Sequence, residues 1–233
     1  MNDISDALTY FAVFLFSTTL HEAAHAWAAL KGGDKTAYHG GQLTLDPLPH
    51  IRREPFGMVV LPLVSALATG WPMGYASAPY NPDWARRYPN RAAWMALAGP
   101  AANLLLVIVA VIALKIGHAS GVFHAPRAIG FGDIIDTDGG AGIFAAGKIV
   151  SAVFSMNLLL CVFNLLPFPP LDGSAAITLL MRPATTARYQ EFIWSTPALG
   201  IVGLLVAWKL FDFVFAPVFF SAVNLLYPGM RYG

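Results

Sequence analysis

The stretch "HEAAH", from His21 to His25, places two histidines and a glutamate inside an apolar run. Histidines four residues apart lie on one face of an α-helix, so both imidazoles can bind one metal ion. Glu22 lies one residue round the helix, which leaves it free to take a proton from water. A bound metal ion lowers the pKa of water towards ~7, and two imidazoles with a carboxylate favour zinc. The spacing therefore predicts zinc-assisted hydrolysis.

The same five-residue pattern also occurs by chance on helix surfaces and in structural metal sites. Its surroundings argue against both alternatives. An ionisable side chain inside a membrane span costs at least ~2.5–3.5 kcal/mol and marks a functional site by default. Because His21, Glu22 and His25 lie on adjacent turns of an apolar segment, we favour a catalytic site.

A catalytic zinc site needs a third protein ligand and an open fourth position. Asp172 is the best candidate, in the stretch "NLLPFPPLDG" from Asn164 to Gly173. The three prolines end the preceding apolar helix and expose backbone, and the glycine permits a tight turn. Read alone, "LDG" is more often a simple turn. Its place at the end of an apolar segment favours Asp172 as the third ligand.

Composition indicates the class of protein that carries these residues. The chain has 233 residues, of which 57% are hydrophobic and only 12% charged, which is typical of an all-α polytopic membrane protein. A formal net charge of +1 gives no sign of nucleic-acid binding. The single cysteine, Cys161, excludes a disulfide framework and a cysteine-type zinc site. We expect one membrane domain over 1–233, with a catalytic core at about 4–173 and C-terminal membrane segments at about 192–227.

Hydropathy predicts about four to five transmembrane helices and a re-entrant segment. Crossing roughly 30 Å of hydrocarbon takes about 20 apolar residues. Four stretches reach that length: Ile4–Leu30, Ala92–Ile116, Gly142–Leu166 and Phe192–Phe211. The shorter Phe56–Trp71 contains a proline and is typical of a re-entrant or half-crossing segment. The last stretch, Phe213–Tyr227, fits an interfacial helix or a second half-span.

The segments between the apolar stretches differ in character. Gly40–His50 contains the alternating run "QLTL", which predicts a short strand or hairpin near the active site. We expect Gly40–Leu45 to clamp an unwound substrate by strand addition. Trp71–Asn90 is rich in Pro, Gly and Tyr and predicts a structured loop, while Gly117–Gly140 predicts a polar loop.

Taken together, "HEAAH" and "NLLPFPPLDG" resemble the motifs of the site-2 protease family of intramembrane zinc metalloproteases. The resemblance covers His21 to Gly173, and "AGPAAN" (98–103) is similar to a further family element. It implies that His21, His25 and Asp172 bind one zinc ion and that Glu22 is the general base. It also implies that Asn164 holds the substrate backbone or the developing oxyanion. No PDZ or CBS domain is visible, so the chain resembles the compact form of the family.

The resemblance implies a protease that cuts single-span membrane proteins within the lipid bilayer. The alternative is a membrane protein that binds or transports zinc without proteolysis, since the same ligands would serve. Neither structural zinc binding nor transport requires a glutamate at position 22, which favours the protease. The sequence leaves the substrate and the oligomeric state open.

Topology adds an expectation about direction. One ion can contact His21 and Asp172 only if the first span and the span before Asp172 run the same way. With Phe56–Trp71 entering and leaving on one side, nine basic residues collect on that side and three on the other, the C-terminal segment left aside. If Phe56–Trp71 crosses fully, the split is seven to five. The nine are Lys31, Lys35, Arg52, Arg53, Arg86, Arg87, Arg91, Arg182 and Arg188; the three are Lys115, Arg127 and Lys148. The positive-inside rule then predicts an active site towards the cytoplasm, in the plasma (inner) membrane.

Two further polar residues lie inside predicted spans. Asn103 fits two roles equally well: support of the active site, or a hydrogen bond that joins two membrane helices. Asn157 lies seven residues before Asn164, on roughly the same helix face. For Asn157 we favour the helix–helix hydrogen bond.

Overall fold

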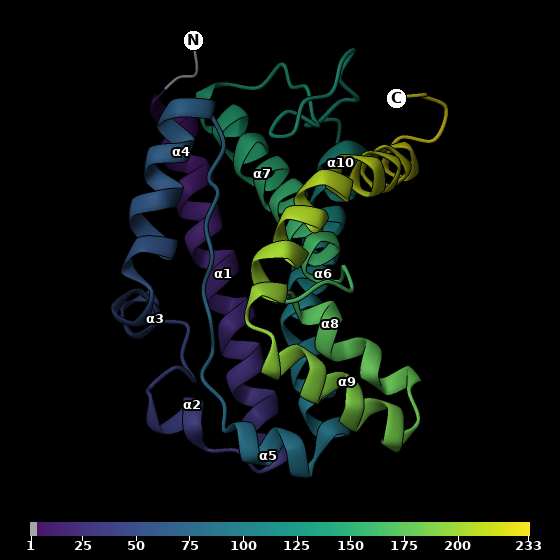
Figure 1. Cartoon of the computed structure of the whole chain (residues 1–233). Coiled ribbons are helices and arrows are strands. Elements are labelled where there is room, and N and C mark those ends of the chain that lie inside the picture. Colours follow the sequence, from purple (N-terminus) through teal and green to yellow (C-terminus); the bar gives the residue numbers. More distant parts are fainter. Residues whose placement is uncertain (1–3) are drawn as a thin grey trace.

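Long apolar helices make up about half of the protein (Figure 1), which is described from a computed structural model over residues 4–233. The four longest are α1 (Ile4–Gly32), α6 (Pro89–Ala119), α7 (Ala141–Asn164) and α10 (Ala198–Leu226). Within 4–233, α6, α7 and α10 are long and apolar enough to cross a membrane. α1 has 29 residues, but its second half carries the hydroxyl side chains before "HEAAH" and that motif itself, which lower its hydropathy. The all-α prediction is confirmed.

Shorter helices connect the long ones. α2 (Thr36–His39), α3 (Pro47–Arg53), a π-helical turn η1 (Phe56–Val60) and α4 (Leu61–Thr69) follow α1. α5 (Pro82–Arg87) precedes α6, while α8 (Asp172–Ala176), the 3-10 turn η2 (Ile177–Leu180) and α9 (Pro183–Ser195) lie between α7 and α10.

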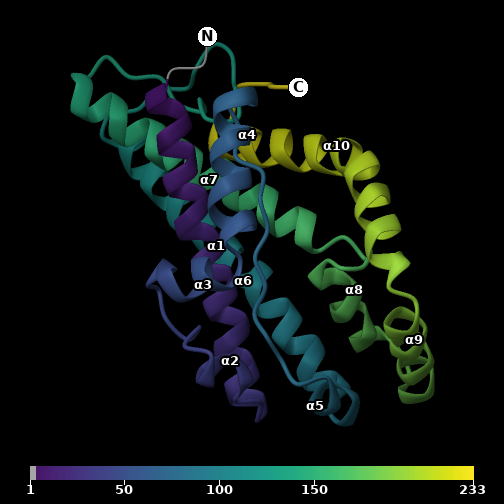
Figure 2. The same ribbon diagram turned by 60° about the vertical axis from the view of Figure 1, so that its left-hand side comes forward.

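α1, α6 and α7 pack against one another and form the centre of the molecule (Figures 1 and 2). α1 and α7 both run downwards in Figure 1, and α6 runs upwards between them in sequence. The two helices that lead to the metal-site residues therefore run the same way, as the topology argument predicted.

The chain from Phe56 to α5 makes an excursion and returns: η1 and α4 make the rise, and the chain after Trp71 makes the return. α4 rises to the level of the N-terminal end of α1, and the chain after it comes back in extended form to α5 at the opposite end (Figure 1). The returning chain lies close against the π-turn, where the Tyr75 N–H donates to the Gly57 carbonyl at 3.0 Å. A Cβ at Gly57 would lie 2.3 Å from the Tyr75 oxygen, so only glycine allows this approach. The arrangement agrees with a re-entrant segment.

The predicted strand at Gly40–Leu45 is wrong. Over 4–233 the structure contains isolated β-bridges but no extended strand, and none of these bridges falls in this stretch. Local bonds take its place: Gly41 adopts a left-handed φ of 74°, and the Gln42 N–H donates to the Ala37 carbonyl at 3.0 Å. Asp46 then caps α3 through the Leu48 N–H. The strand-addition clamp expected at Gly40–Leu45 therefore loses the strand edge on which it was based.

The C-terminal segments divide differently from the prediction. Phe192 belongs to α9, which ends at Ser195, and Thr196 and Pro197 separate it from α10. α10 then continues through both predicted segments, with Pro217 inside it. Proline lacks the N–H that would bond to the carbonyl four residues earlier, which bends a helix without ending it when packing holds both halves. Figure 2 shows α10 turning through a marked bend.

A buried aspartate joins the turn after α1 to the end of the extended segment at Asn81, and its removal should destabilise the fold. Asp34 is 4% exposed and accepts hydrogen bonds from the Thr36 N–H (2.9 Å), the Thr36 hydroxyl (2.6 Å) and the Asn81 N–H (2.8 Å). We expect Asp34→Ala to lower stability by roughly 2–3 kcal/mol because buried donors lose a charged acceptor. In a thermal-unfolding assay in detergent the Tm should fall by about 4–10 °C. Asp83→Ala, which removes an exposed pair with Arg86, should leave the Tm nearly unchanged.

Candidate active site

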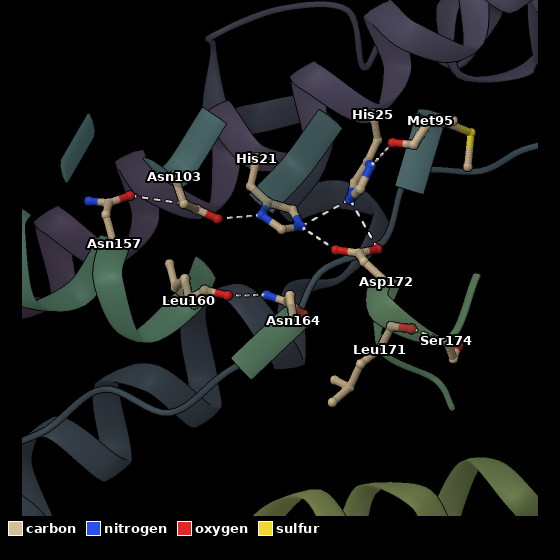
Figure 3. Close-up of polar contacts among 10 residues, drawn as sticks. All are labelled: His21, His25, Met95, Asn103, Asn157, Leu160, Asn164, Leu171, Asp172 and Ser174. Atoms are coloured by element: carbon tan, nitrogen blue, oxygen red, sulfur yellow. Dashed lines mark hydrogen bonds and ion pairs between the residues drawn. The ribbon is translucent and has the colours of Figure 1, made fainter. Parts of the chain in front are cut away.

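The predicted metal-site residues, from the second half of α1 and the start of α8, converge on one point (Figure 3). The Nε2 atoms of His21 and His25 lie 3.0 Å apart, one turn apart on the same helix face. Asp172, the first residue of α8, places Oδ2 3.1 Å from His21 Nε2 and Oδ1 3.3 Å from His25 Nε2. Both histidines are buried, at 6% and 5% exposure. Tertiary folding thus brings Asp172 next to His21 and His25, which precede it in the chain by 151 and 147 positions.

The chemistry of this cluster fits a divalent cation. His25 Nδ1 lies 2.7 Å from the Met95 carbonyl, which can only accept, so Nδ1 carries a proton and the neutral ring has its lone pair at Nε2. Carboxylate oxygens of Asp172 face the same point and also only accept when ionised. Imidazole nitrogens with a carboxylate are the donors that zinc prefers.

Glu22 lies beside the cluster with its carboxylate available. It is 4% exposed, and one of its carboxylate oxygens lies within 4.8 Å of a ring nitrogen of His21 and of His25. Its Oε2 has no hydrogen-bond partner among residues 4–233. A buried carboxylate oxygen without a donor is suited to accept a proton from a water molecule held at the cluster.

Three residues of α6 face the two histidines at matched spacing. Met95, Gly99 and Asn103 are four residues apart and so share one helix face. The Met95 carbonyl contacts His25, and Asn103 Oδ1 lies 2.5 Å from His21 Nδ1. A Cβ built on Gly99 would lie 2.4 Å from both Nε2 atoms. The sequence analysis did not assign a role to Met95 or Gly99, although the small residue in "AGPAAN" four positions before the asparagine was a usable signal.

Asn164 is near the cluster but is turned towards its own helix. Its Nδ2 donates to the Leu160 carbonyl at 2.9 Å (Figure 3). The amide nitrogen carries two hydrogens, so one remains for another acceptor. The role predicted for Asn164, holding the substrate or the oxyanion, stays a prediction.

Comparison with known families decides what kind of protein carries this cluster. The model of "Peptidase family M50" matches residues 9–204, which include every residue of the cluster. The chain belongs to peptidase family M50. This is the site-2 protease family, so the M50 chain is a site-2-type metalloprotease with apolar membrane helices.

Two groups of relatives agree with the M50 assignment. The chain is 32% identical over 177 residues to "Putative zinc metalloprotease YwhC" of Bacillus subtilis. The aligned region covers 76% of this chain and 71% of that protein. It is 31% identical over 174 residues to "Putative zinc metalloprotease Rip2" of Mycobacterium tuberculosis, covering 75% of this chain and 58% of Rip2. The names of these M50 relatives imply zinc, which the donor set described above fits. No solved structure matches the chain significantly.

Gly99 gives the site a direct test of its geometry. We expect Gly99→Ala to abolish zinc binding, because the new methyl group would occupy the space between the two Nε2 atoms and α6. Zinc content of the purified protein, measured by atomic spectroscopy, should fall from one ion per chain to a small fraction. Gly200→Ala, in α10 with open space around it, is the matched control and should keep its zinc. A zinc-loaded Gly99→Ala protein would contradict this geometry.

Proposed function

We propose that this chain hydrolyses peptide bonds in or near the transmembrane segments of single-span membrane proteins, using one Zn²⁺ per chain. His21, His25 and Asp172 would hold the ion. The observation that carries the proposal is the convergence of these three side chains, at 3.0–3.3 Å, beside a buried glutamate with a free carboxylate oxygen. A structural zinc site or a zinc transporter does not require a general base at Glu22.

Each residue has a defined part in the reaction. Zinc, when bound, acts as a Lewis acid that polarises the scissile carbonyl and lowers the pKa of water. Glu22 accepts the proton of the attacking water at Oε2 and then delivers it to the leaving amine nitrogen. The free hydrogen of Asn164 Nδ2 donates to the carbonyl oxygen as negative charge develops there. The Met95 carbonyl holds the His25 ring in place throughout.

A largely apolar cavity against α7, just before Asn164, supports a membrane-embedded substrate. It has a volume of about 290 Å³ and lies between α1, the extended chain after Trp71, α7 and α10. Its lining includes Phe14, Met156, Leu160 and Phe211, and Leu160 also accepts the Asn164 hydrogen bond. A hydrophobic side chain of a substrate segment fits such a cavity better than a polar one.

We place the protein in the plasma (inner) membrane with its active site towards the cytoplasm. The basic residues of α5, Arg86 and Arg87, lie at the same end of the molecule as the C-terminus of α1 and its Lys31 (Figure 1). Excess Lys and Arg at one end of a membrane protein mark its cytoplasmic side. A cysteine-accessibility scan that puts Arg52 and Arg87 on opposite faces would contradict this arrangement.

The experiment that tests the function compares cells that express the wild type with cells that express Glu22→Gln. Newly formed peptide termini are mapped across the membrane proteome. Termini inside predicted spans, present only with the wild type, support intramembrane proteolysis and identify substrates. If the two maps stay identical even when candidate substrates are supplied in shortened form, the zinc-transport alternative is favoured.

A further inference from the structure

Two buried asparagines connect the three central helices to His21. Asn103 of α6 and Asn157 of α7 are both 0% exposed. Asn103 Nδ2 donates to Asn157 Oδ1 at 2.9 Å, and Asn103 Oδ1 lies 2.5 Å from His21 Nδ1 of α1 (Figure 3). Asn157 Nδ2 in turn donates to the Val153 carbonyl at 2.8 Å and to the Ser17 hydroxyl at 2.9 Å.

The direction of every bond in this chain follows from the Val153 carbonyl. A backbone carbonyl only accepts, so the Asn157 amide must turn its nitrogen to it and its oxygen to Asn103. That oxygen also only accepts, so Asn103 must present its nitrogen there and its oxygen to His21. The oxygen of Asn103 then requires a hydrogen on His21 Nδ1. Reversing either amide would set two acceptors face to face in a buried site.

We propose that Asn103 and Asn157 are positioning residues that fix the neutral His21 ring in the tautomer protonated at Nδ1. This keeps the lone pair of Nε2 pointed at Asp172 and the metal site. The Val153 carbonyl of α7 thus fixes the orientation of Asn157, which fixes that of Asn103 on α6, which in turn fixes the proton position of His21 on α1. They therefore act on the site through His21 and do not contact the substrate.

His25 shows why such a device is needed at His21. His25 obtains the same tautomer directly, because its Nδ1 faces the Met95 carbonyl. His21 has only an asparagine amide at Nδ1, and an amide can present either an oxygen or a nitrogen. Without Asn157 the Asn103 amide is free to turn, and its nitrogen would then favour the tautomer whose proton blocks Nε2.

The proposal rests on the proposed role of His21 as a zinc ligand, so the test measures zinc affinity and not proteolysis. The full-length protein, loaded with zinc in detergent micelles, is titrated with a chelator of known affinity. We expect Asn103→Leu, which has nearly the same shape, to weaken zinc binding about 10- to 100-fold, as is typical when a partner of a ligating histidine is lost. Asn157→Leu should give a smaller loss. The double variant should bind no more weakly than Asn103→Leu alone.

Matched variants separate positioning from packing. Ser155→Ala changes a fully buried polar residue of α7 whose hydroxyl has no partner within the described chain, and should leave zinc affinity unchanged. Ser17→Ala removes one acceptor of Asn157 but leaves the Val153 carbonyl, so zinc affinity should stay within about twofold of the wild type. Asn103→Asp keeps an acceptor for His21. It should retain most of the zinc affinity, while its second oxygen, facing Asn157 Oδ1, lowers the Tm.

The outcomes distinguish this proposal from the proposed function. ¹⁵N NMR of histidine-labelled protein should show His21 protonated at Nδ1 in the wild type and in Asn103→Asp. A wild type that binds zinc, with an Asn103→Leu variant of equal affinity, overturns the positioning role and leaves the metalloprotease intact. A wild type that binds no zinc, or a His21→Ala variant that keeps full affinity, overturns both.

Discussion

Glu22→Gln should abolish peptide hydrolysis while the protein still binds one zinc ion per chain. Glutamine has almost the same shape as glutamate but cannot accept the proton of the attacking water. General-base catalysis contributes about 10²- to 10⁴-fold, so we expect a loss of at least that size. Cleavage of a single-span substrate in liposomes gives the rate, and atomic spectroscopy gives the zinc content of the same preparation.

The control for this substitution is Glu191→Gln, on the exposed side of α9. It makes the same chemical change at an exposed carboxylate outside the cluster and should keep the wild-type rate. Cleavage by Glu22→Gln at more than a tenth of the wild-type rate would assign the proton transfer to another group. Loss of zinc from Glu22→Gln would instead place Glu22 among the ligands.

Asp172→Ala should remove zinc from the protein under conditions in which the wild type retains it. Asp172 supplies the two oxygens that face His21 and His25, at 3.1 and 3.3 Å, and a catalytic zinc requires three protein ligands. The affinity should fall by more than the roughly 10- to 100-fold that follows loss of an outer-shell partner. Chelator competition measures this change, and proteolysis should be lost with the metal.

Asp138→Ala provides the matched control. Asp138 is exposed and lies 3.8 Å from His124 in the loop between α6 and α7, away from the cluster. It should bind zinc as the wild type does. If Asp172→Ala kept wild-type zinc affinity, Glu22 would have to be the third ligand, and the division of roles between the two carboxylates would be reversed.

Some features of this protein are local, and the sequence determined them. The four-residue spacing of His21 and His25 places both rings on one helix face whatever surrounds the helix. Apolar runs predicted the long helices to within a few residues, since α6 and α7 (Pro89–Ala119 and Ala141–Asn164) include most of Ala92–Ile116 and Gly142–Leu166. The prolines after Asn164 ended α7 because proline has no backbone N–H to donate and its ring clashes with the preceding turn of a helix.

The incorrect predictions came from competition between local patterns. In Gly40–Leu45 the alternating side chains suggested a strand, but a strand needs a partner to bond its backbone, and a left-handed glycine and an N-cap satisfied that backbone first. In the C-terminal part, the sequence analysis divided the chain after Phe211 and placed Pro217 inside a separate last segment, whereas α10 runs through both. A helix continues through proline when packing on either side compensates for the missing bond.

Only the tertiary structure decided which residues of different helices meet. Asp172 was proposed as a ligand from its motif, but its distance to His21 depends on where α7 ends and how the proline-rich turn folds back. The direction of the Asn157–Asn103–His21 bonds left no sign in the periodicity of the sequence. Periodicity fixes the face of a helix on which a residue lies, whereas the rotation and depth of one helix against another follow from the packing of all of them at once.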